Sequence, residues 1–132
     1  MNELDEIRQW ALTAAAAAAG KKADDTIVLD VSGVLAITEY FVITSAGNDR
    51  LVKAIVDEVE RRVDETGGPK PMRIEGLADA QWVLMDYGDF VVHVFLEEIR
   101  RYYDLERLWS DVPQIPFDEA VGVTPASAAG GE

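Results

Sequence analysis

The stretch from Trp82 to Trp109 constrains the fold more than any other part of the chain. It contains two apolar runs, 82–85 and 90–96, separated by the four residues Asp-Tyr-Gly-Asp at 86–89. Two runs rich in β-branched and aromatic residues, joined through a glycine, predict a β-hairpin, because glycine reaches positive φ without a steric penalty. Both faces of each predicted strand are apolar. The hairpin is therefore predicted to lie inside a sheet, covered on both sides by helices or by a partner.

Successive side chains of a strand point to opposite faces, so the two faces of the hairpin can be assigned from the sequence. In the first strand, Trp82, Leu84 and Asp86 fall on one face, and Val83 and Met85 on the other. In the second strand, one face carries Phe90, Val92, Val94 and Leu96, and the opposite face carries Val91, His93 and Phe95. After Leu96 the apolar spacing becomes helical through Ile99 and Tyr103, with a break predicted near Asp104.

The residues before the hairpin predict two helices and three strands. A first helix is predicted from a cap at Asn2 to Gly20, and its alanine run, 14–19, is expected to pack shallowly because methyl groups bury little surface. Strands are predicted at 26–31 and 40–45, and an edge strand at 71–75, where proline limits pairing. A second helix is predicted after Asn48, with the apolar stripe Val52, Ile55, Val56, Val59 and Val63.

These elements predict one α/β (α+β) domain with a mixed five-stranded sheet and packed helices. The domain is predicted to span residues 1–112. Residues 113–132 contain prolines and small residues and show no periodicity, so we expect a flexible tail there, with Ile115 and Phe117 able to dock.

The chain is strongly acidic, with 25 Asp and Glu against 12 Lys and Arg and a formal net charge of −13. Nucleic-acid binders usually present clustered cations, so direct DNA binding or specific RNA binding is not expected. The charge serves solubility alone or favours a basic protein partner. The chain has no cysteine, no apolar run long enough to span a membrane and no signal-peptide pattern at its start. The cytoplasm is the expected compartment.

Several short motifs occur in a fixed order along residues 4–112. They are Lys22-Ala23-Asp24-Asp25-x-x-x-Leu29-Asp30-Val31, Tyr40-Phe41-Val42-Ile43-Thr44, Lys53-Ala54-Ile55, Glu75-Gly76, Asp86-Tyr87-Gly88-Asp89, Val92-His93-Val94-Phe95 and Arg101-Tyr102-Tyr103-x-Leu105-Glu106-x-Leu108-Trp109. Together they resemble the ribosomal silencing factor family (RsfS, also called Iojap). Glu39 and Asp49 depart from the residues that the family usually carries there, and the alanine run and the tail lie outside its pattern.

The resemblance implies a nucleotidyltransferase-like fold and a non-enzymatic function. It implies binding to the large ribosomal subunit through ribosomal protein L-fourteen, which would sterically block association with the small subunit and repress translation. The alternative is a nucleotide-binding or nucleotidyltransferase-type enzyme on the same fold. Such an enzyme needs carboxylates that hold a divalent metal against a triphosphate, usually an Asp-x-Asp pair after Gly-Ser. The chain has neither this arrangement nor a glycine-rich phosphate loop.

No residue is therefore assigned as catalytic, cofactor-binding or metal-binding. His93 is the only histidine, and without cysteine the usual zinc ligand sets cannot be assembled. We interpret His93 as a strand histidine that is hydrogen-bonded within the core. The predicted partner-binding residues are aromatic and acidic, as is typical of anchors in protein interfaces: Trp82, Asp86, Tyr87, Tyr102 and Tyr103. Trp10 and Trp109 are interpreted as core residues. Strands with two apolar faces and few helices to cover them also predict a homodimer.

Overall fold

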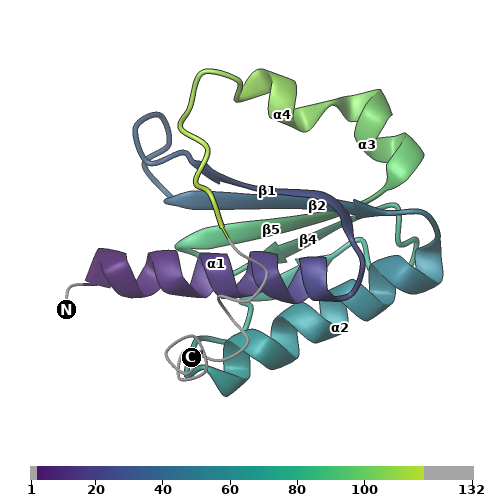
Figure 1. Cartoon of the computed structure of the whole chain (residues 1–132), viewed down its shortest axis with the longest axis horizontal. Coiled ribbons are helices and arrows are strands. Elements are labelled where there is room, and N and C mark those ends of the chain that lie inside the picture. Colours follow the sequence, from purple (N-terminus) through teal and green to yellow (C-terminus); the bar gives the residue numbers. More distant parts are fainter. Residues whose placement is uncertain (1–2, 118–132) are drawn as a thin grey trace, which may run out of the picture.

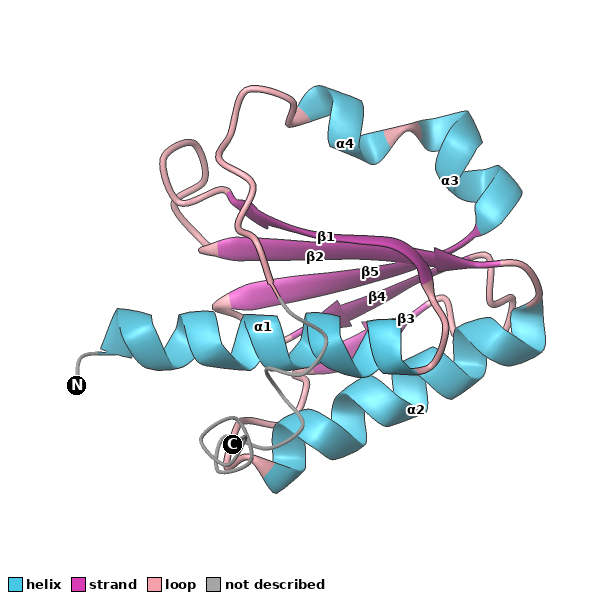
Figure 2. Ribbon diagram, in the orientation of Figure 1, coloured by secondary structure: helices cyan, strands magenta, loops and turns pink. Residues whose placement is uncertain are grey.

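The computed structural model describes residues 3–117, which form one mixed sheet with helices on both faces (Figures 1 and 2). The elements in chain order are α1 (Glu3–Gly20), β1 (Asp24–Asp30), β2 (Tyr40–Ala46), α2 (Asp49–Glu65), β3 (Arg73–Glu75), β4 (Trp82–Asp86), β5 (Phe90–Leu96), α3 (Glu97–Tyr103) and α4 (Leu105–Leu108). The strand order is β1-β2-β5-β4-β3. Only β2 and β5 run parallel; the other neighbours are antiparallel. The predicted mixed five-stranded sheet is confirmed.

The hairpin predicted from the sequence is present at the centre of the sheet. β4 and β5 pair antiparallel, with Val83 opposite Val94, and the turn between them contains Gly88 at a φ of 85°. β3 lies at the edge, as predicted for a short strand after a proline. The predicted break after α3 falls at Asp104, which has a φ of 49° and separates α3 from α4.

The two long helices α1 and α2 cover one face of the sheet (Figure 1). The predicted apolar stripe of α2 is buried, and Asn48 caps the helix by accepting a 2.8 Å hydrogen bond from the Leu51 amide. Trp10 of α1 is half-buried against the core of this face, as expected. The predicted cap at Asn2 lies outside the described residues.

The expectation that α1 packs shallowly was wrong. Four residues of its alanine run, Ala14, Ala15, Ala17 and Ala18, are 0% exposed and belong to the main core. The short methyl side chains let the axis of α1 come close to the sheet and to α2. The alanines are buried because the helix lies close to its neighbours, although each side chain is short. The small area that each alanine buries does not limit how completely the helix is buried.

Residues 113–117 follow the outer edge of β1. The Asp30 amide donates to the Pro113 carbonyl at 2.9 Å, and the Ile115 amide donates to the Val28 carbonyl at 2.8 Å. Ile115 is buried and Phe117 is half-buried against the core, so the docking expected for these two side chains is present. The remainder of the predicted tail, residues 118–132, lies outside the described residues. Within the described part, no helix is both long and apolar enough to cross a membrane.

Candidate partner-binding site

The second face of the sheet is covered only in part. The short helices α3 and α4, here called the arm (residues 97–108), pack on this face with Ile99, Leu105 and the following Trp109. Their partners come from β1 and the residue after it, from β2 and from β5: Leu29, Val31, Phe41, Ile43 and Phe95. Beyond the arm, over β3, β4 and part of β5, the sheet is left open. This open region is the place where a partner can meet apolar strand residues directly.

An apolar cleft of about 420 Å³ occupies the open region. Its lining comes from β2 to β5 and from the segments beside them: Leu35, Ile37, Thr38, Phe41, Met72, Arg73, Glu75, Leu84, Asp86, Gly88, Val91 and His93. Ile37 and Met72, at the rim, are 84% and 73% exposed. Exposed apolar side chains grouped around a hollow are typical of protein-binding surfaces. We refer to this hollow as the cleft.

Trp82 lies next to the cleft and connects the sheet with the arm. It is half-buried, and its Nε1–H donates a 3.1 Å hydrogen bond to Nδ1 of His93. Its ring centroid is 4.8 Å from that of Phe95 and 5.1 Å from that of Tyr103. Tyr103 in turn packs edge-on against Tyr102, which is 79% exposed. The structure thus brings three of the five predicted partner-binding residues into one aromatic group.

Asp86 lies on the same face as Trp82, whereas Tyr87 does not. The Asp86 carboxylate accepts a 2.8 Å hydrogen bond from the Gly88 amide and pairs with Arg73 at 3.2 Å on the rim of the cleft. Tyr87 points to the opposite face, where it is 5% exposed and stacks on Phe90 at 4.5 Å. Burial there raises the pKa of the Tyr87 hydroxyl. The sequence placed Tyr87 beside Trp82, but the alternation of the strand continues into the turn and separates them.

His93 has the structural role that was predicted, a hydrogen bond within the core. Burial lowers its pKa to about 4, so the ring is neutral at pH 7. Because Nδ1 accepts from Trp82, the single proton of the neutral ring is carried by Nε2. That nitrogen is buried and has no hydrogen-bond partner among the described residues. His93, one of the residues that line the cleft, therefore carries an unsatisfied donor.

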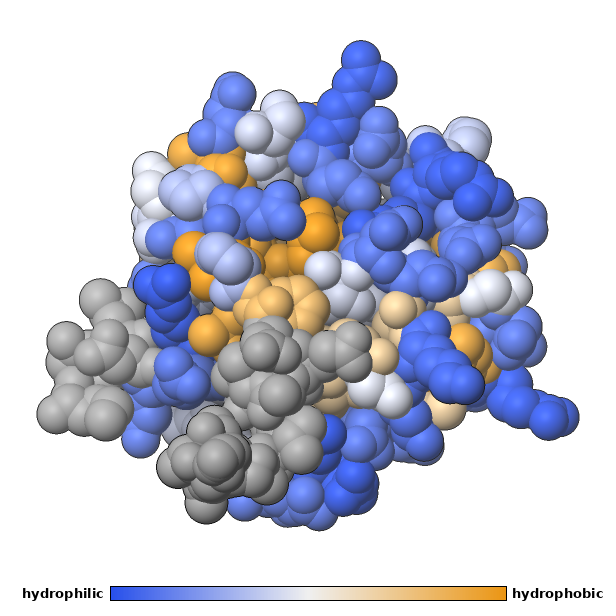
Figure 3. Space-filling model, viewed as in Figure 1, coloured by the Kyte–Doolittle hydropathy of each residue, from blue (hydrophilic) through white to orange (hydrophobic). Residues whose placement is uncertain are grey.

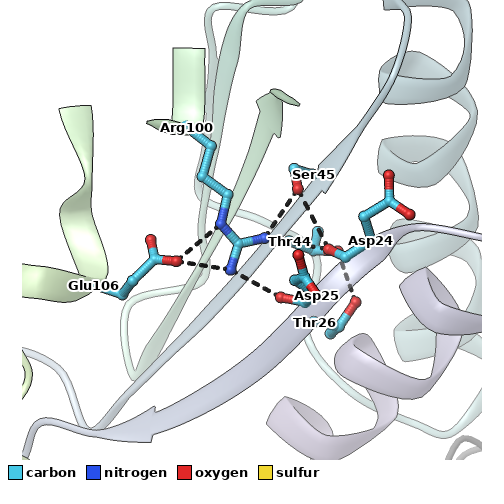
Figure 4. A network of polar contacts seen from close by, with 7 residues as sticks. All are labelled: Asp24, Asp25, Thr26, Thr44, Ser45, Arg100 and Glu106. Atoms are coloured by element: carbon cyan, nitrogen blue, oxygen red, sulfur yellow. Dashed lines mark hydrogen bonds and ion pairs between the residues drawn. The ribbon is translucent and has the colours of Figure 1, made fainter. Parts of the chain in front are cut away.

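Arg100, which the sequence reasoning did not single out, fixes the arm to the sheet (Figure 4). Its guanidinium is buried and contacts β1 and β2, which are distant in the sequence, and Glu106, six residues further along the chain. It donates to the carbonyls of Asp24 (3.2 Å) and Asp25 (2.8 Å), to Ser45 Oγ (2.9 Å) and to Glu106 Oε2 (3.1 Å from Nε). The planar fork of arginine suits this role, because several donors are held in one rigid plane.

The sequence did contain a signal for Arg100. The residue lies four positions after Leu96 and three before Tyr103, so it falls on the inward stripe of the helical segment. A basic side chain on an inward stripe needs hydrogen-bond acceptors, because burying an unpaired charge is costly. The backbone carbonyls at the start of β1 provide them. Because Tyr103 contacts Trp82 and Trp109 contacts Phe41 (5.3 Å), fixing the arm also positions the aromatic group beside the cleft.

The surface around these elements is mostly hydrophilic. Figure 3 shows hydrophilic residues over the arm and α2, with a band of apolar surface between the arm and α1. Among the described residues, no group of three or more His, Asp or Glu side chains is arranged to hold a metal ion.

Comparison with known proteins identifies the family. The family model described as "Ribosomal silencing factor during starvation" matches residues 4–131. The chain is 43% identical over 105 residues to "Ribosomal silencing factor RsfS" of Bacillus subtilis (strain 168), which covers 80% of this chain and 88% of that protein. The chain belongs to the ribosomal silencing factor family. A relative in Mus musculus, named "Mitochondrial assembly of ribosomal large subunit protein 1", is 32% identical over 68% of this chain and 40% of its own length.

The fold of the ribosomal silencing factors agrees with the structure described above. A crystal structure of a protein from Chromobacterium violaceum superposes with a TM-score of 0.72 at 32% sequence identity. It covers 93% of this chain and 100% of that chain. The resemblance inferred from short ordered motifs is thus confirmed over nearly the whole length.

Proposed function

We propose that this ribosomal silencing factor binds the large ribosomal subunit through ribosomal protein L-fourteen and blocks association with the small subunit. The observation that carries the proposal is the open half of the sheet, where an apolar cleft adjoins the aromatic group of Trp82, Tyr102 and Tyr103. Large aromatic residues beside a hollow and a charged rim are the usual composition of an interface centre. The family membership, and the name of the mouse relative, support the large subunit as the target.

The net charge of −13 supports a protein partner on the ribosome. An acidic chain is repelled by the phosphates of ribosomal RNA within the screening distance of about 8 Å at physiological salt. A basic ribosomal protein attracts it, and complementary charge raises the rate of encounter. The action needs no chemistry, because a bound protein of this size on the joining surface would exclude the small subunit by its volume.

Sedimentation with purified subunits tests the proposal. The chain should travel with large subunits and not with small ones, and an excess should reduce the formation of joined ribosomes. Travel with small subunits alone, or with neither, would refute it.

Two tryptophans provide a matched pair of variants for the same assay. Trp82 and Trp10 are both half-buried, but they lie on opposite faces of the sheet. Trp82→Ala should weaken binding to the large subunit by about 30-fold or more after correction for the folded fraction. Trp10→Ala should lower the free energy of unfolding and leave the affinity of the folded protein unchanged. Equal affinities for the two variants would remove the Trp82 face from the interface.

A further inference from the structure

We propose that the cleft receives an apolar side chain from a basic segment of the partner protein, and that His93 Nε2–H donates a hydrogen bond to an acceptor on that segment. The inference rests on the proposed function, because the partner is taken to be the large-subunit protein.

The cleft has the size and the lining of a specific site. Its volume of about 420 Å³ falls within the range of roughly 300–1,000 Å³ found for ligand sites. Its floor is built from rigid strands and includes Phe41, Leu84 and Val91. The rim carries Ile37 and Met72, which are largely exposed to water when the site is empty. An apolar side chain placed between them removes this surface from water and is stabilised for that reason.

His93 supplies the polar specificity of the cleft. Its Nδ1 is committed to Trp82, and its Nε2–H is buried without an acceptor among the described residues. A buried donor without a partner destabilises the free protein. A partner that brings a carbonyl or carboxylate oxygen to His93 removes this penalty, whereas a purely apolar occupant leaves it in place. The donor therefore favours a peptide segment over a hydrocarbon ligand.

Charge favours a basic segment over a second copy of this chain. The rim of the cleft carries Glu75 and Asp86 against a single cation, Arg73. Arg73 is within 3.3 Å of both carboxylates, so the rim keeps a net negative charge. A second copy also carries −13 and is repelled, while Lys or Arg residues flanking the inserted side chain would be attracted.

The apolar part of the proposal is tested with two exposed residues of one loop. Ile37 lines the cleft and is 84% exposed, whereas Val34 is 63% exposed and does not line it. Neither side chain contributes to the core, so Ile37→Ser and Val34→Ser should both fold normally. Calorimetric titration with isolated protein L-fourteen should show an affinity about tenfold weaker for Ile37→Ser and unchanged for Val34→Ser. Equal affinities for the two variants would overturn the proposed occupant.

The role of His93 is tested with two amides of different length. In His93→Asn the side-chain oxygen lies near the position of Nδ1, so it still accepts from Trp82 while the outer donor is lost. In His93→Gln the amide reaches the position of Nε2 and keeps a donor there. Denaturant melts give the folded fraction of each variant. The folded Asn variant should bind about 5- to 30-fold more weakly than wild type, and the folded Gln variant within about threefold. Equal binding by wild type and the Asn variant would overturn the donor role.

The outcomes separate this inference from the proposed function. If the wild-type chain binds large subunits and every cleft variant binds equally well, the cleft proposal fails and the ribosomal function stands. If Ile37→Ser changes only the self-association measured by light scattering, a second copy occupies the cleft and the proposal is overturned. If the wild-type chain does not bind large subunits, both fail together.

Discussion

Trp82 and His93 show how two side chains on neighbouring strands determine each other's chemistry. The indole N–H fixes the tautomer of the imidazole, and burial keeps the ring neutral. The same pair lies between the core and the open face, so its hydrogen bond contributes to stability and also shapes the floor of the cleft. Neither the tautomer nor the neutral state of His93 can be assigned from the residue types alone. A histidine in a strand can have many environments, and an indole N–H has many possible acceptors.

The lowered pKa of His93 predicts a specific dependence of stability on pH. The unfolded pKa is near 6.5 and the folded pKa is about 4, so between these values the unfolded chain binds more protons. The contribution is fully present above pH 6.5 and is lost as the pH falls toward 4. It should amount to about 3 kcal/mol of unfolding free energy. Urea melts of wild type and His93→Asn at pH 7, 5.5 and 4.5 check this. Parallel curves for the two proteins would contradict the assignment.

At the scale of elements, the arm illustrates how a short helical segment becomes ordered. α3 and α4 are too short to be stable alone, and Asp104 interrupts them with a left-handed backbone. Their position depends on the apolar contacts of Ile99, Leu105 and Trp109 and on the Arg100 network (Figure 4). Arg100 satisfies carbonyls at the start of β1, where the strand is irregular between Asp24 and Ile27.

Replacement of Arg100 should release the arm. Arg100→Lys keeps the charge but has a single ammonium, which cannot reach Ser45, Glu106 and the β1 carbonyls together. We expect a loss of about 2 kcal/mol or more in unfolding free energy and faster amide exchange within 97–108 than in α2. The control is Arg101→Lys, one residue later, whose side chain is 72% exposed and pairs with Glu97 only at 3.9 Å. Arg101→Lys should leave both quantities unchanged. Equal effects at the two positions would show that Arg100 does not fix the arm.

At the scale of the whole molecule, the two faces of the sheet are covered unequally. α1 and α2 seal one face with a continuous core, while the arm leaves part of the other open (Figure 1). The proposed ribosomal partner would cover the open face, and a second copy is the competing occupant. These two occupants respond differently to salt, because one is attracted to the acidic chain and the other repelled.

Salt should therefore shift the two associations in opposite directions. Raising the salt concentration screens charge, so binding of protein L-fourteen should weaken, on the order of tenfold between low and high salt. Self-association, driven by apolar surface and opposed by two charges of −13, should strengthen. Calorimetry follows the first and light scattering the second. A monomer mass at every salt and micromolar concentration would rule out the predicted homodimer.

The sequence predicted those features that arise from local periodicity. Strand alternation assigned Trp82 and Val83 to opposite faces, helical spacing gave the buried stripe of α2, and Gly88 marked the turn of the central hairpin. Each is a property of a few neighbouring residues and of backbone geometry. The family was likewise recognisable, because the order of its short motifs is itself a property of the chain.

Only the tertiary structure decided which residues meet across the sheet. Strand order placed β5 between β2 and β4, which brought Phe41 and Leu84 to opposite sides of His93 and formed the cleft. The depth of α1 depended on the distance between layers, and the burial of Tyr87 on how far the strand alternation continues into the turn. By itself the sequence determined which face each side chain takes within the regular strands and helices, since that follows from local geometry. The partners of each side chain were decided by the packing of segments distant in the chain, because burial and hydrogen bonding depend on everything that surrounds a group.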